Sequence, residues 1–390
     1  MTDLPVVIAG AGVGGLSAAL AMAAAGRPTI VLERATELSE FGAGLQLGPN
    51  ASRRLRRWDA LDPLLAHGLA PTCVRIFSGE SGREIVEIPV ADAQRRWGAP
   101  YILAHRADLL RALADRAASN PLIEIRLGRE VEGWSETAER VTVHAGEDIA
   151  GAALIGADGV RSRVRAGLRL ADPDRPVYAR RTAWRALAPA DAVDPAFLAP
   201  ASALRLSAGA HLVHYPLRNA SVVNLVAIVE DEWNEPDMAD VWSTEGDAGY
   251  LAARFAGWSA DVRGLLAAAP QWRRWPLFMR RPIARWGRGR VTLLGDAAHA
   301  MPPFLAQGAA QAIEDADALG AAFARLKHPA AAIGMYEQAR VARASRVQAM
   351  SVRQGRIYHL SGPMAAARDM SMRMLGPAGM ARATDWLYRV

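Results

Sequence analysis

The chain has few of the features that mark secreted, metal-binding or membrane-spanning proteins. Its 390 residues contain one cysteine, Cys73, which excludes an intramolecular disulfide and any metal site built from cysteines alone. No stretch reaches the roughly 18 consecutive apolar residues that a membrane-spanning helix needs. Residues 16–25 are apolar and end in alanines, but no basic segment precedes them as one would in a signal peptide. We therefore expect a cytoplasmic protein without a membrane span.

The chain also lacks concentrated charge and internal repeats. Charged residues make up 22% and hydrophobic residues 51% of the sequence, which is ordinary for a globular enzyme. The net charge of +6 is carried mostly by arginine, and it would suit either a nucleic acid or small anions such as carboxylates and dinucleotide phosphates. Because the basic residues are scattered rather than clustered, we expect no nucleic-acid partner.

The order of the expected elements indicates two interleaved domains, because 390 residues are too many for one small core. A buried strand, an alanine-rich helix and a second strand form a βαβ unit at the N-terminus. Short strands, aromatic residues and prolines then predict an antiparallel sheet of a different domain. A strand and helix typical of a nucleotide fold return after it, and the last segment is mainly helical. In order, these segments are residues 6–9, 16–25 and 29–32, then 177–275, then 290–294 and 306–326, and finally 335–390.

Smaller elements are expected between these segments. Residues 51–65 are predicted to form one helix, and residues 74–90 two strands around a glycine-containing turn. Residues 123–127, 130–134 and 141–144 are predicted to form a small antiparallel meander, because apolar and polar residues alternate in them.

A glycine-rich segment near the N-terminus predicts a dinucleotide-binding loop. Gly10-Ala11-Gly12-Val13-Gly14-Gly15 stands between the first strand and the first helix. In such a loop the first glycine permits the tight turn, the second lets the backbone approach a pyrophosphate, and the last lets helix and strand pack closely. Glu33 ends the second strand at the distance expected for a contact with an adenosine ribose. A glycine cluster that serves only packing is the weaker alternative, and the loop alone does not separate NAD from FAD.

Two further motifs stand later in the chain. Gly295-Asp296, in residues 293–299, places a carboxylate at a strand end, and Asp158-Gly159 lies in the arginine-rich residues 156–165. Each segment alone would fit a simple turn, but the three motifs in this order resemble the FAD-dependent aromatic hydroxylases, which are single-component flavoprotein monooxygenases. In that family the Gly-Asp segment holds the ribityl chain of FAD, whose hydroxyls can donate hydrogen bonds to the carboxylate, and the Asp-Gly segment serves FAD and NAD(P)H together. The resemblance therefore favours FAD over NAD.

The resemblance extends over nearly the whole chain. Further segments that look like those of the family are Glu33-Arg34 and residues 42–50, 105–109, 275–277, 305–310 and 312–316. The most similar branches are the 3-hydroxybenzoate 6-hydroxylases, the salicylate hydroxylases and the 6-hydroxynicotinate 3-monooxygenases. Residues 42–46, 211–218 and 384–387 lean toward the 3-hydroxybenzoate branch.

The resemblance implies a set of FAD-binding residues beyond the glycine loop. Arg106 is expected to contact FAD, and residues 44–47 to run beside the isoalloxazine ring. Gly308 is expected to begin a helix aimed at the flavin pyrimidine, where a helix N-terminus would stabilise negative charge on the reduced flavin. Together, the expected cofactor-binding residues are Gly10, Gly12, Gly14, Gly15, Glu33, Arg34, Gly44, Leu45, Gln46, Arg106, Asp158, Asp296, Gly308 and Ala309.

On this basis we expect an α/β fold in which a Rossmann-like FAD-binding domain is interleaved with an antiparallel β-sheet substrate domain and followed by a helical C-terminal tail. The FAD-binding domain is expected to comprise residues 1–75, 100–176 and 276–345, the substrate domain residues 76–99 and 177–275, and the tail residues 346–390. The tail could form a homodimer interface or cover the active site, and the sequence does not decide between these roles.

The reaction that the resemblance implies is the hydroxylation of a phenolic or hydroxylated aromatic acid with NAD(P)H and O2. NADH or NADPH reduces FAD as a transient co-substrate, O2 then gives a flavin C4a-hydroperoxide, and that electrophile hydroxylates the ring. A base that helps to ionise the phenol is useful, since a phenolate is much the better nucleophile. Two alternatives stay open at this point: a non-hydroxylating flavin or NAD oxidoreductase, and a flavin-bound sensor without turnover.

His211 and Tyr215 are the expected catalytic residues. They stand four apart in a predicted strand and so point to one face, and the matching residues of the relatives line the ring-binding pocket. Packing in a core is the alternative for both side chains. His214 points to the opposite face and is expected to be structural. No residue near His299 has metal-ligand spacing, so no metal site is expected.

The expected pocket departs from each branch of the family. Ala300 stands where the family usually has proline. Gln46 and Phe304 stand where the hydroxynicotinate enzymes have histidines, and Pro303 stands where the 3-hydroxybenzoate enzymes have glutamine. The reaction class therefore follows from the resemblance more firmly than the substrate does, and a heteroaromatic substrate of the 6-hydroxynicotinate type stays an alternative.

Overall fold

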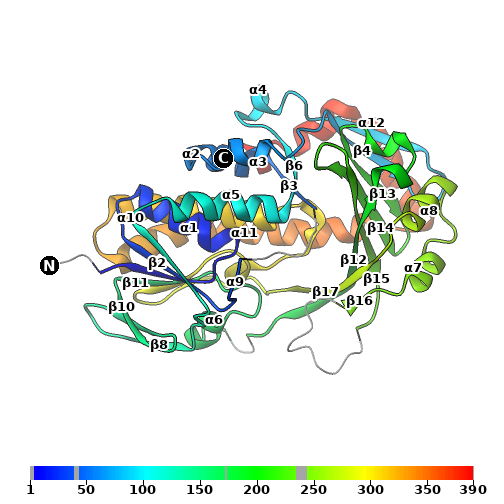
Figure 1. Ribbon diagram of the computed structural model, residues 1–390. Helices are drawn as coiled ribbons and strands as arrows, with labels where there is room; N and C mark the ends of the chain where they lie inside the picture. The colour runs from blue at the N-terminus through cyan, green and yellow to red at the C-terminus, as the bar shows by residue number, and fades with distance from the viewer. Residues whose placement is uncertain (1–3, 39–43, 172–173, 234–243, 390) are drawn as a thin grey trace.

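A five-stranded parallel sheet forms the centre of the first domain of the computed structural model, which describes residues 4–38, 44–171, 174–233 and 244–389 (Figure 1). All residues of its strands β1 (Val6–Ala9) and β11 (Ala153–Gly156) are buried, as expected for parallel strands with both faces covered. The strand order is β18 (Val291–Leu293), β11 (Ala153–Gly156), β1 (Val6–Ala9), β2 (Thr29–Glu33) and β7 (Ile123–Leu127). Numbered by their position in the chain and read from β7, these strands have the order 3-2-1-4-5 of a doubly wound fold, so the predicted Rossmann-like domain is confirmed.

Helices α1 (Val13–Ala24), α5 (Arg106–Ala118) and α10 (Gly308–Arg325) lie side by side along this sheet (Figure 1). Small residues let α1 and α10 approach closely. A Cβ at Gly320 would lie 2.7 Å from the carbonyl oxygen of Ala21, and a Cβ at Gly14 would lie 3.4 Å from the Cβ of Ala312. The close packing of the two helices therefore holds the start of α10 beside the dinucleotide loop.

The meander expected from the sequence is wrong in its first strand. Residues 123–127 form β7, which pairs in parallel with β2 at the edge of the central sheet. The antiparallel meander consists instead of β8 (Gly133–Glu136), β9 (Val141–His144) and β10 (Asp148–Gly151). An alternating pattern indicates that one face of a strand is buried, but it does not indicate which strand is its neighbour.

The single helix expected over residues 51–65 is also wrong. Asp59 has a φ of 54°, a left-handed conformation that ends one helix before the next begins. The two helices are α2 (Pro49–Arg57) and α3 (Leu61–Leu65). They adjoin a two-stranded antiparallel ribbon of β3 (Gly44–Leu47) and β6 (Ile102–His105), which leads toward the second domain.

An eight-stranded sheet forms the second domain. Its order is β16 (Thr244–Glu245), β17 (Arg273–Met279), β12 (Val177–Pro189), β15 (Val222–Glu230), β14 (Ala210–Leu217), β13 (Ala201–Ser207), β4 (Cys73–Ser78) and β5 (Glu84–Pro89). All neighbours are antiparallel, as predicted, except β13 and β4, which are far apart in sequence and so are not bound by a hairpin. Because β4 begins at Cys73, the domain boundary expected between residues 75 and 76 falls within a strand.

The two faces of this sheet have different neighbours. One face packs against α7 (Ala248–Arg254) and α8 (Ala260–Ala267) in a core that includes Trp184 and Phe255. In Figure 1 these helices lie on the side of the sheet away from the first domain. Alternate residues of β12, β14 and β15 therefore point toward the FAD-binding domain, and the active site is expected on that face.

The expected helical tail is present and folds back on the rest of the chain. Helix α11 (Pro329–Tyr358) leads from the first domain toward the eight-stranded sheet, and α12 (Gly362–Ala383) packs against β5 (Figure 1). The last helix, α13 (Asp385–Tyr388), lies next to α2. The outward side of α12 exposes Met364, Met370, Met374 and Leu375.

Three short helices complete the domains. They are α4 (Ala93–Trp97), α6 (Arg163–Leu168) and α9 (Asp296–His299), and single 3-10 turns occur at Ala190–Ala192, Pro195–Leu198 and Pro303–Leu305. In the described ranges of the chain, no helix combines the length and the apolar composition that crossing a membrane requires.

Candidate active site

The glycine loop has the shape that a pyrophosphate requires. Gly10 has a φ of +99°, and a Cβ there would lie 2.7 Å from the carbonyl oxygen of Ala157. A Cβ at Gly15 would collide with the carbonyl oxygen of Gly10, so helix and strand meet only because both residues are glycine. By contrast, nothing lies within 4 Å of the position of a Cβ on Gly12, which caps α1. The loop therefore leaves open space in front of the free N–H groups of a helix, as FAD binding needs.

Glu33 supports this loop from the end of β2. One oxygen of its carboxylate accepts a hydrogen bond from the backbone N–H of Ala11 at 2.8 Å, and the other accepts one from Ala35 at 3.0 Å. The carboxylate thus lies against the turn, at the place expected for a ribose contact. The neighbouring Arg34 is exposed, and its expected role in FAD binding stays a prediction.

A cavity of about 320 Å³ opens between this loop and the eight-stranded sheet. It brings together segments that are far apart in sequence. The expected site residues that line it are Gly12, Gly14, Gly44, Leu45, Gln46, Arg106, Asp296, Gly308 and Ala309 from the first domain and from β3, and His211 and Tyr215 from β14. The expected residues outside its lining are Gly10, Gly15, Glu33, Arg34 and Asp158. The cavity therefore joins the expected flavin-facing segments to the expected catalytic pair.

Asp158 is directed into the protein rather than into the cavity. Its carboxylate accepts hydrogen bonds from the Ser162 hydroxyl at 2.5 Å and from the backbone N–H of Arg163 at 2.7 Å, so it caps the start of α6. Burial raises the pKa of Asp158, although these hydrogen bonds oppose the rise. The backbone of Ala157 and Gly159 lines the cavity on either side. Asp158 therefore holds the shape of the turn, and its expected role in cofactor binding stays a prediction.

The second motif places its carboxylate at the cavity. Gly295 has a φ of 62°, which an L side chain rarely adopts, and Asp296 follows it as an exposed residue at the cavity. The backbone N–H of Gly295 donates a hydrogen bond to Asp315 at 3.0 Å. This contact fixes the turn, so that the Asp296 carboxylate can accept hydrogen bonds from the ribityl chain of FAD.

The turn rests on a buried ionic network between α9, α10 and α11. Arg340 donates hydrogen bonds to Asp315 at 2.7 Å and to Glu314 at 2.5 Å, and His299 contacts Asp315 at 2.5 Å. Burial alone would raise the pKa of Asp315, but His299 and Arg340 outweigh it and lower the pKa to about 2. The pKa of Glu314 is also lowered to about 2, since Arg343 and Arg340 outweigh its burial. His299 therefore has a structural partner, and no cluster of metal-binding side chains occurs among the described residues.

Removing Arg340 should destabilise the protein strongly. Arg340→Leu leaves two buried carboxylates without their shared partner, and we expect a loss of about 3–5 kcal/mol in the free energy of unfolding. The measurement is urea denaturation at neutral pH, with Arg353→Leu, an exposed arginine of the same helix, as the control. A stability equal to that of the control variant would show that the network contributes nothing.

The same network should make the protein acid-sensitive. Because the pKa values of Glu314 and Asp315 are lowered to about 2, their stabilising contribution is complete above the ordinary carboxyl pKa of about 4 and is lost as the pH falls toward 2. Stability should therefore fall over this window in the wild type and more gently in Arg340→Leu. Parallel acid-denaturation curves for the two proteins would contradict this assignment.

The eight-stranded sheet forms the floor of the cavity. His211, Val213 and Tyr215 of β14 line it together with Val226 and Ile228 of β15, which confirms that His211 and Tyr215 share one face. Burial, then the neighbouring His359, lowers the pKa of His211 well below its ordinary value. A neutral imidazole at neutral pH can accept a proton.

Tyr215 and His214 of β14 lie on opposite faces of the sheet, as the alternation of side chains along a strand requires. Burial raises the pKa of Tyr215, so its hydroxyl stays protonated and can donate a hydrogen bond. His214 lies on the opposite face, where Arg205 donates a hydrogen bond to its Nε2 at 3.1 Å. Burial and this arginine lower the pKa of His214 to about 3, which fits the structural role expected for it.

The β3 ribbon reaches this floor through Gly44. The backbone N–H of Gly44 donates a hydrogen bond to the side-chain oxygen of Asn224 at 2.7 Å, and a Cβ at Gly44 would lie 2.7 Å from the Tyr215 hydroxyl. Gln46 is held by Tyr101, whose hydroxyl donates to it at 2.6 Å. Residues 42 and 43, which begin the family-like segment 42–50, lie outside the described part of the chain.

Several residues of the site were missed from the sequence. Arg185 of β12 lines the cavity, and Asn224 contacts Gly44. Strand alternation could have found both, because they stand an even number of residues from other positions on the same face. His359, beyond the end of α11, hydrogen-bonds to His211. No pattern in the helical tail indicates that contact.

Comparison with known proteins agrees with this geometry. Residues 3–351 match the model of a family described as FAD binding domain. The chain is 37% identical to 3-hydroxybenzoate 6-hydroxylase 1 of Aquipseudomonas alcaligenes, over 98% of this chain and 97% of that protein. It is 35% identical to 6-hydroxynicotinate 3-monooxygenase of Bordetella bronchiseptica, over 89% and 90% of the two chains. The crystal structure of HpxO of Klebsiella pneumoniae complexed with FAD and uric acid superposes with a TM-score of 0.85 at 26% identity, covering 97% of this chain and 95% of that one.

The match to the family model spans most of the chain, the sequence relatives align over nearly their whole length, and the glycine loop and Asp296 have the geometry that FAD needs. This chain therefore belongs to the FAD binding domain family and is a flavoprotein monooxygenase that hydroxylates aromatic compounds with FAD as its cofactor.

Proposed function

We propose that this monooxygenase hydroxylates the ring of a phenolic carboxylic acid, with 3-hydroxybenzoate as the first candidate and NAD(P)H and O2 as co-substrates. The observation that carries the proposal is the position of a buried, neutral His211 in the same cavity as Asp296 and Gly308. Two further relatives that are 33% and 35% identical to this chain also bear the name 3-hydroxybenzoate 6-hydroxylase, which supports the choice of substrate.

The cofactor would be held by the dinucleotide loop, Asp296 and the start of α10. When bound, FAD supplies the activated oxygen that is transferred to the ring. Gly308, the first residue of α10, lines the cavity with nothing within 4 Å of its Cβ position, so the positive end of this helix is open to a ligand. A helix N-terminus in that place stabilises negative charge.

The protein's own residues would orient and ionise the substrate. His211 is 2% exposed, and the rings of Phe304 and Tyr358 meet it edge-on with centroids at 5.5 Å and 5.3 Å. These contacts hold the imidazole in place. His211 would take the phenolic proton through Nε2, and the protonated Tyr215 would donate a hydrogen bond to the substrate oxygen.

Arg185 is the residue that we expect to bind the carboxylate. It lies half-buried in the cavity lining, with its guanidinium 5.6 Å from the centre of the Trp275 ring. It points to the same face of the sheet as Val226, its neighbour on β15. A guanidinium in this position matches a carboxylate in both charge and geometry.

Replacing Arg185 should weaken the binding of acids selectively. A hydrogen bond to a charged group is worth about 1.5–3 kcal/mol, so Arg185→Gln should raise KM for the aromatic acid about 10- to 100-fold with a smaller effect on kcat. The matched comparison is the corresponding aromatic amide, whose KM should change little. Equal effects on the acid and the amide would remove Arg185 from carboxylate binding.

The substrate class can be tested with a panel. Purified holoenzyme would be mixed with NADH or NADPH and with hydroxybenzoates, salicylates or hydroxynicotinates, and both NAD(P)H loss and product mass would be followed. A product heavier by one oxygen from 3-hydroxybenzoate supports the proposal. Such a product only from 6-hydroxynicotinate would favour the second candidate, which the 35% identity to the Bordetella enzyme supports.

A cytoplasmic location rests on the single cysteine and stays a prediction, as does a homodimer.

A further inference from the structure

Two buried histidines and a carboxylate form a continuous hydrogen-bonded chain beneath the substrate cavity. His211 Nδ1 lies 2.7 Å from His359 Nε2, and His359 Nδ1 lies 3.0 Å from a carboxylate oxygen of Glu230. The side chain of His359 is 2% exposed, whereas that of Glu230 is 47% exposed. The chain therefore leads from a buried base toward solvent.

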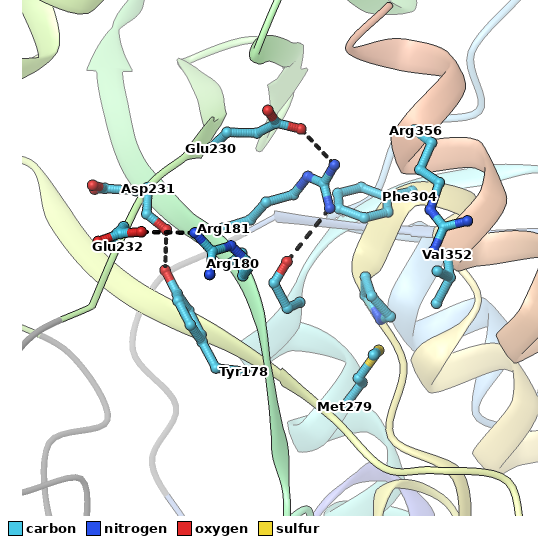
Figure 2. Close-up of a pocket in the computed structure, with 12 residues that line it drawn as sticks. Tyr178, Arg180, Arg181, Glu230, Asp231, Glu232, Met279, Phe304, Val352 and Arg356 are labelled. Atoms are coloured by element: carbon cyan, nitrogen blue, oxygen red, sulfur yellow. Dashed lines mark hydrogen bonds and ion pairs between the residues drawn. The ribbon is translucent and has the colours of Figure 1, made fainter.

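The exposed end of this chain opens into a second cavity of about 640 Å³. Glu230, Arg181, Phe304 and Arg356 line it, and Figure 2 shows the Glu230 carboxylate directed at the Arg181 guanidinium, which lies beside the Phe304 ring. His211 lines only the substrate cavity and Glu230 only the second one, whereas His359 lines neither. The two histidines and the carboxylate thus connect two cavities that share no lining residue.

The strands explain why these groups meet. Glu230 stands two residues beyond Ile228, the partner of His211 in the sheet register, so both side chains point to the same face. Arg181 is opposite Glu230 in the register of β12 and β15. The register of β12 is irregular between Tyr178 and Thr182, a bulge that redirects side chains next to the site.

Hydrogen-bond directions along the chain follow from the carboxylate. An ionised carboxylate only accepts, so His359 donates from Nδ1 to Glu230 and accepts at Nε2. His211 must then donate from Nδ1, which leaves a lone pair on its Nε2. Within the described residues, that nitrogen has no protein partner, and His211 lines the substrate cavity. The chain therefore sets His211 in the tautomer that a base needs.

The charged groups around the two histidines are consistent with these hydrogen-bond directions. Arg181 Nε also lies 3.4 Å from His359 Nδ1, but the contact of that nitrogen with Glu230 is shorter at 3.0 Å, and Arg181 is itself bound to Glu230 at 2.6 Å. Arg368 of α12 faces the same histidine. Burial lowers the pKa of His359 to about 4 although Glu230 opposes this shift, so both histidines are neutral at neutral pH.

We propose that His359 and Glu230 form a proton relay that carries the phenolic proton of the substrate from His211 to the second cavity, an inference that rests on the proposed function. The proton leaves the phenol oxygen for His211 Nε2, and the electron pair stays on the phenolate. The proton on His211 Nδ1 passes to His359 Nε2, and the proton on His359 Nδ1 passes to Glu230, which releases it to water in the second cavity. After the ring has reacted, His211 Nε2 returns its proton to the phenolate oxygen of the product, His359 Nε2 returns its proton to His211 Nδ1, and Glu230 passes a proton taken from water to His359 Nδ1, which restores both tautomers.

His359 and Glu230 are positioning residues, and the first test of their role needs no substrate. In holoenzyme labelled with 15N-histidine, NMR should show both His211 and His359 protonated at Nδ1. Signals would be assigned with His211→Gln and His359→Gln. A proton on Nε2 of His211 would overturn the relay, because that nitrogen could not then accept from a phenol.

The second test measures turnover. Glu230→Gln can still accept a hydrogen bond from His359 but cannot take up its proton, so product formation should fall about 10-fold, less than the 10²–10⁴-fold typical of a direct base. The matched control is Glu232→Gln, a neighbouring carboxylate that lines the same cavity and pairs with Arg180. It should turn over like the wild type.

Chemical rescue separates a relay from a merely structural role. His359→Ala should be slowed, and added imidazole should restore product formation in proportion to its free-base concentration. Full turnover by Glu230→Gln, or no rescue of a correctly folded, FAD-loaded His359→Ala, would contradict the relay. Failure of the proposed function looks different, since the wild type itself would then form no product from any phenolic acid.

Discussion

His211→Ala will keep FAD and bind the aromatic acid, but it will form hydroxylated product about 10²–10⁴-fold more slowly than the wild type, the range expected for loss of one acid–base group. The variant removes the imidazole in the cavity floor that can accept the phenolic proton. The ring must then react as the poorly nucleophilic phenol. Reduced flavin should still consume O2, so NADH oxidation should become uncoupled from product formation.

The measurement is product formed per NADH consumed at saturating substrate. His214→Gln is the matched control, since it changes the other histidine of the same strand on the opposite face of the sheet. It should reduce stability but leave the rate of product formation near that of the wild type. Unchanged product formation in His211→Ala would remove this residue from the mechanism.

Asp296→Ala will be purified largely without FAD. Its carboxylate is exposed at the cavity edge, and the left-handed Gly295 and the bond to Asp315 hold it there. Each lost hydrogen bond to a charged group costs about 1.5–3 kcal/mol, so the affinity for FAD should fall about 10- to 100-fold for each ribityl contact.

Flavin absorbance after gel filtration measures this effect directly. Asp296→Asn keeps an acceptor oxygen without the charge and should bind FAD with intermediate affinity. Excess FAD should partly restore activity to the alanine variant if its fold is intact. Full FAD occupancy in Asp296→Ala would contradict the assignment of this motif.

The parts of the fold that the sequence predicted are those determined by neighbouring residues. Gly10 and Gly15 can be recognised locally because the backbone conformation and the helix contact each demand glycine. The pairing of residues 123–127 with β2, and the parallel pairing of β4 with β13, are set by segments far away in the chain. Local alternation carries no information about such neighbours, and at these points the expectation was incomplete or wrong. The helix expected over residues 51–65 was wrong for a local reason, the left-handed conformation of Asp59.

The residues of the site also divide into those that the sequence predicted and those that it did not. His211 and Tyr215 could be placed on one face from strand alternation, and Asp296 from its motif. His359 and Glu230 could not, because their contact depends on where the end of α11 meets β15. For Asp158, the motif was recognised from the sequence, but only the structure shows that the carboxylate caps α6.

The most direct test of the central claim is the origin of the oxygen atom in the product. Holoenzyme would be supplied with NADH and 18O2 in ordinary water, with the preferred aromatic acid from the panel, and the product would be analysed by mass spectrometry. A flavoprotein monooxygenase incorporates one labelled oxygen atom per product molecule and consumes one NADH and one O2 for each. Product that carries oxygen from water, or substrate-dependent NADH oxidation without O2 uptake, would contradict the account.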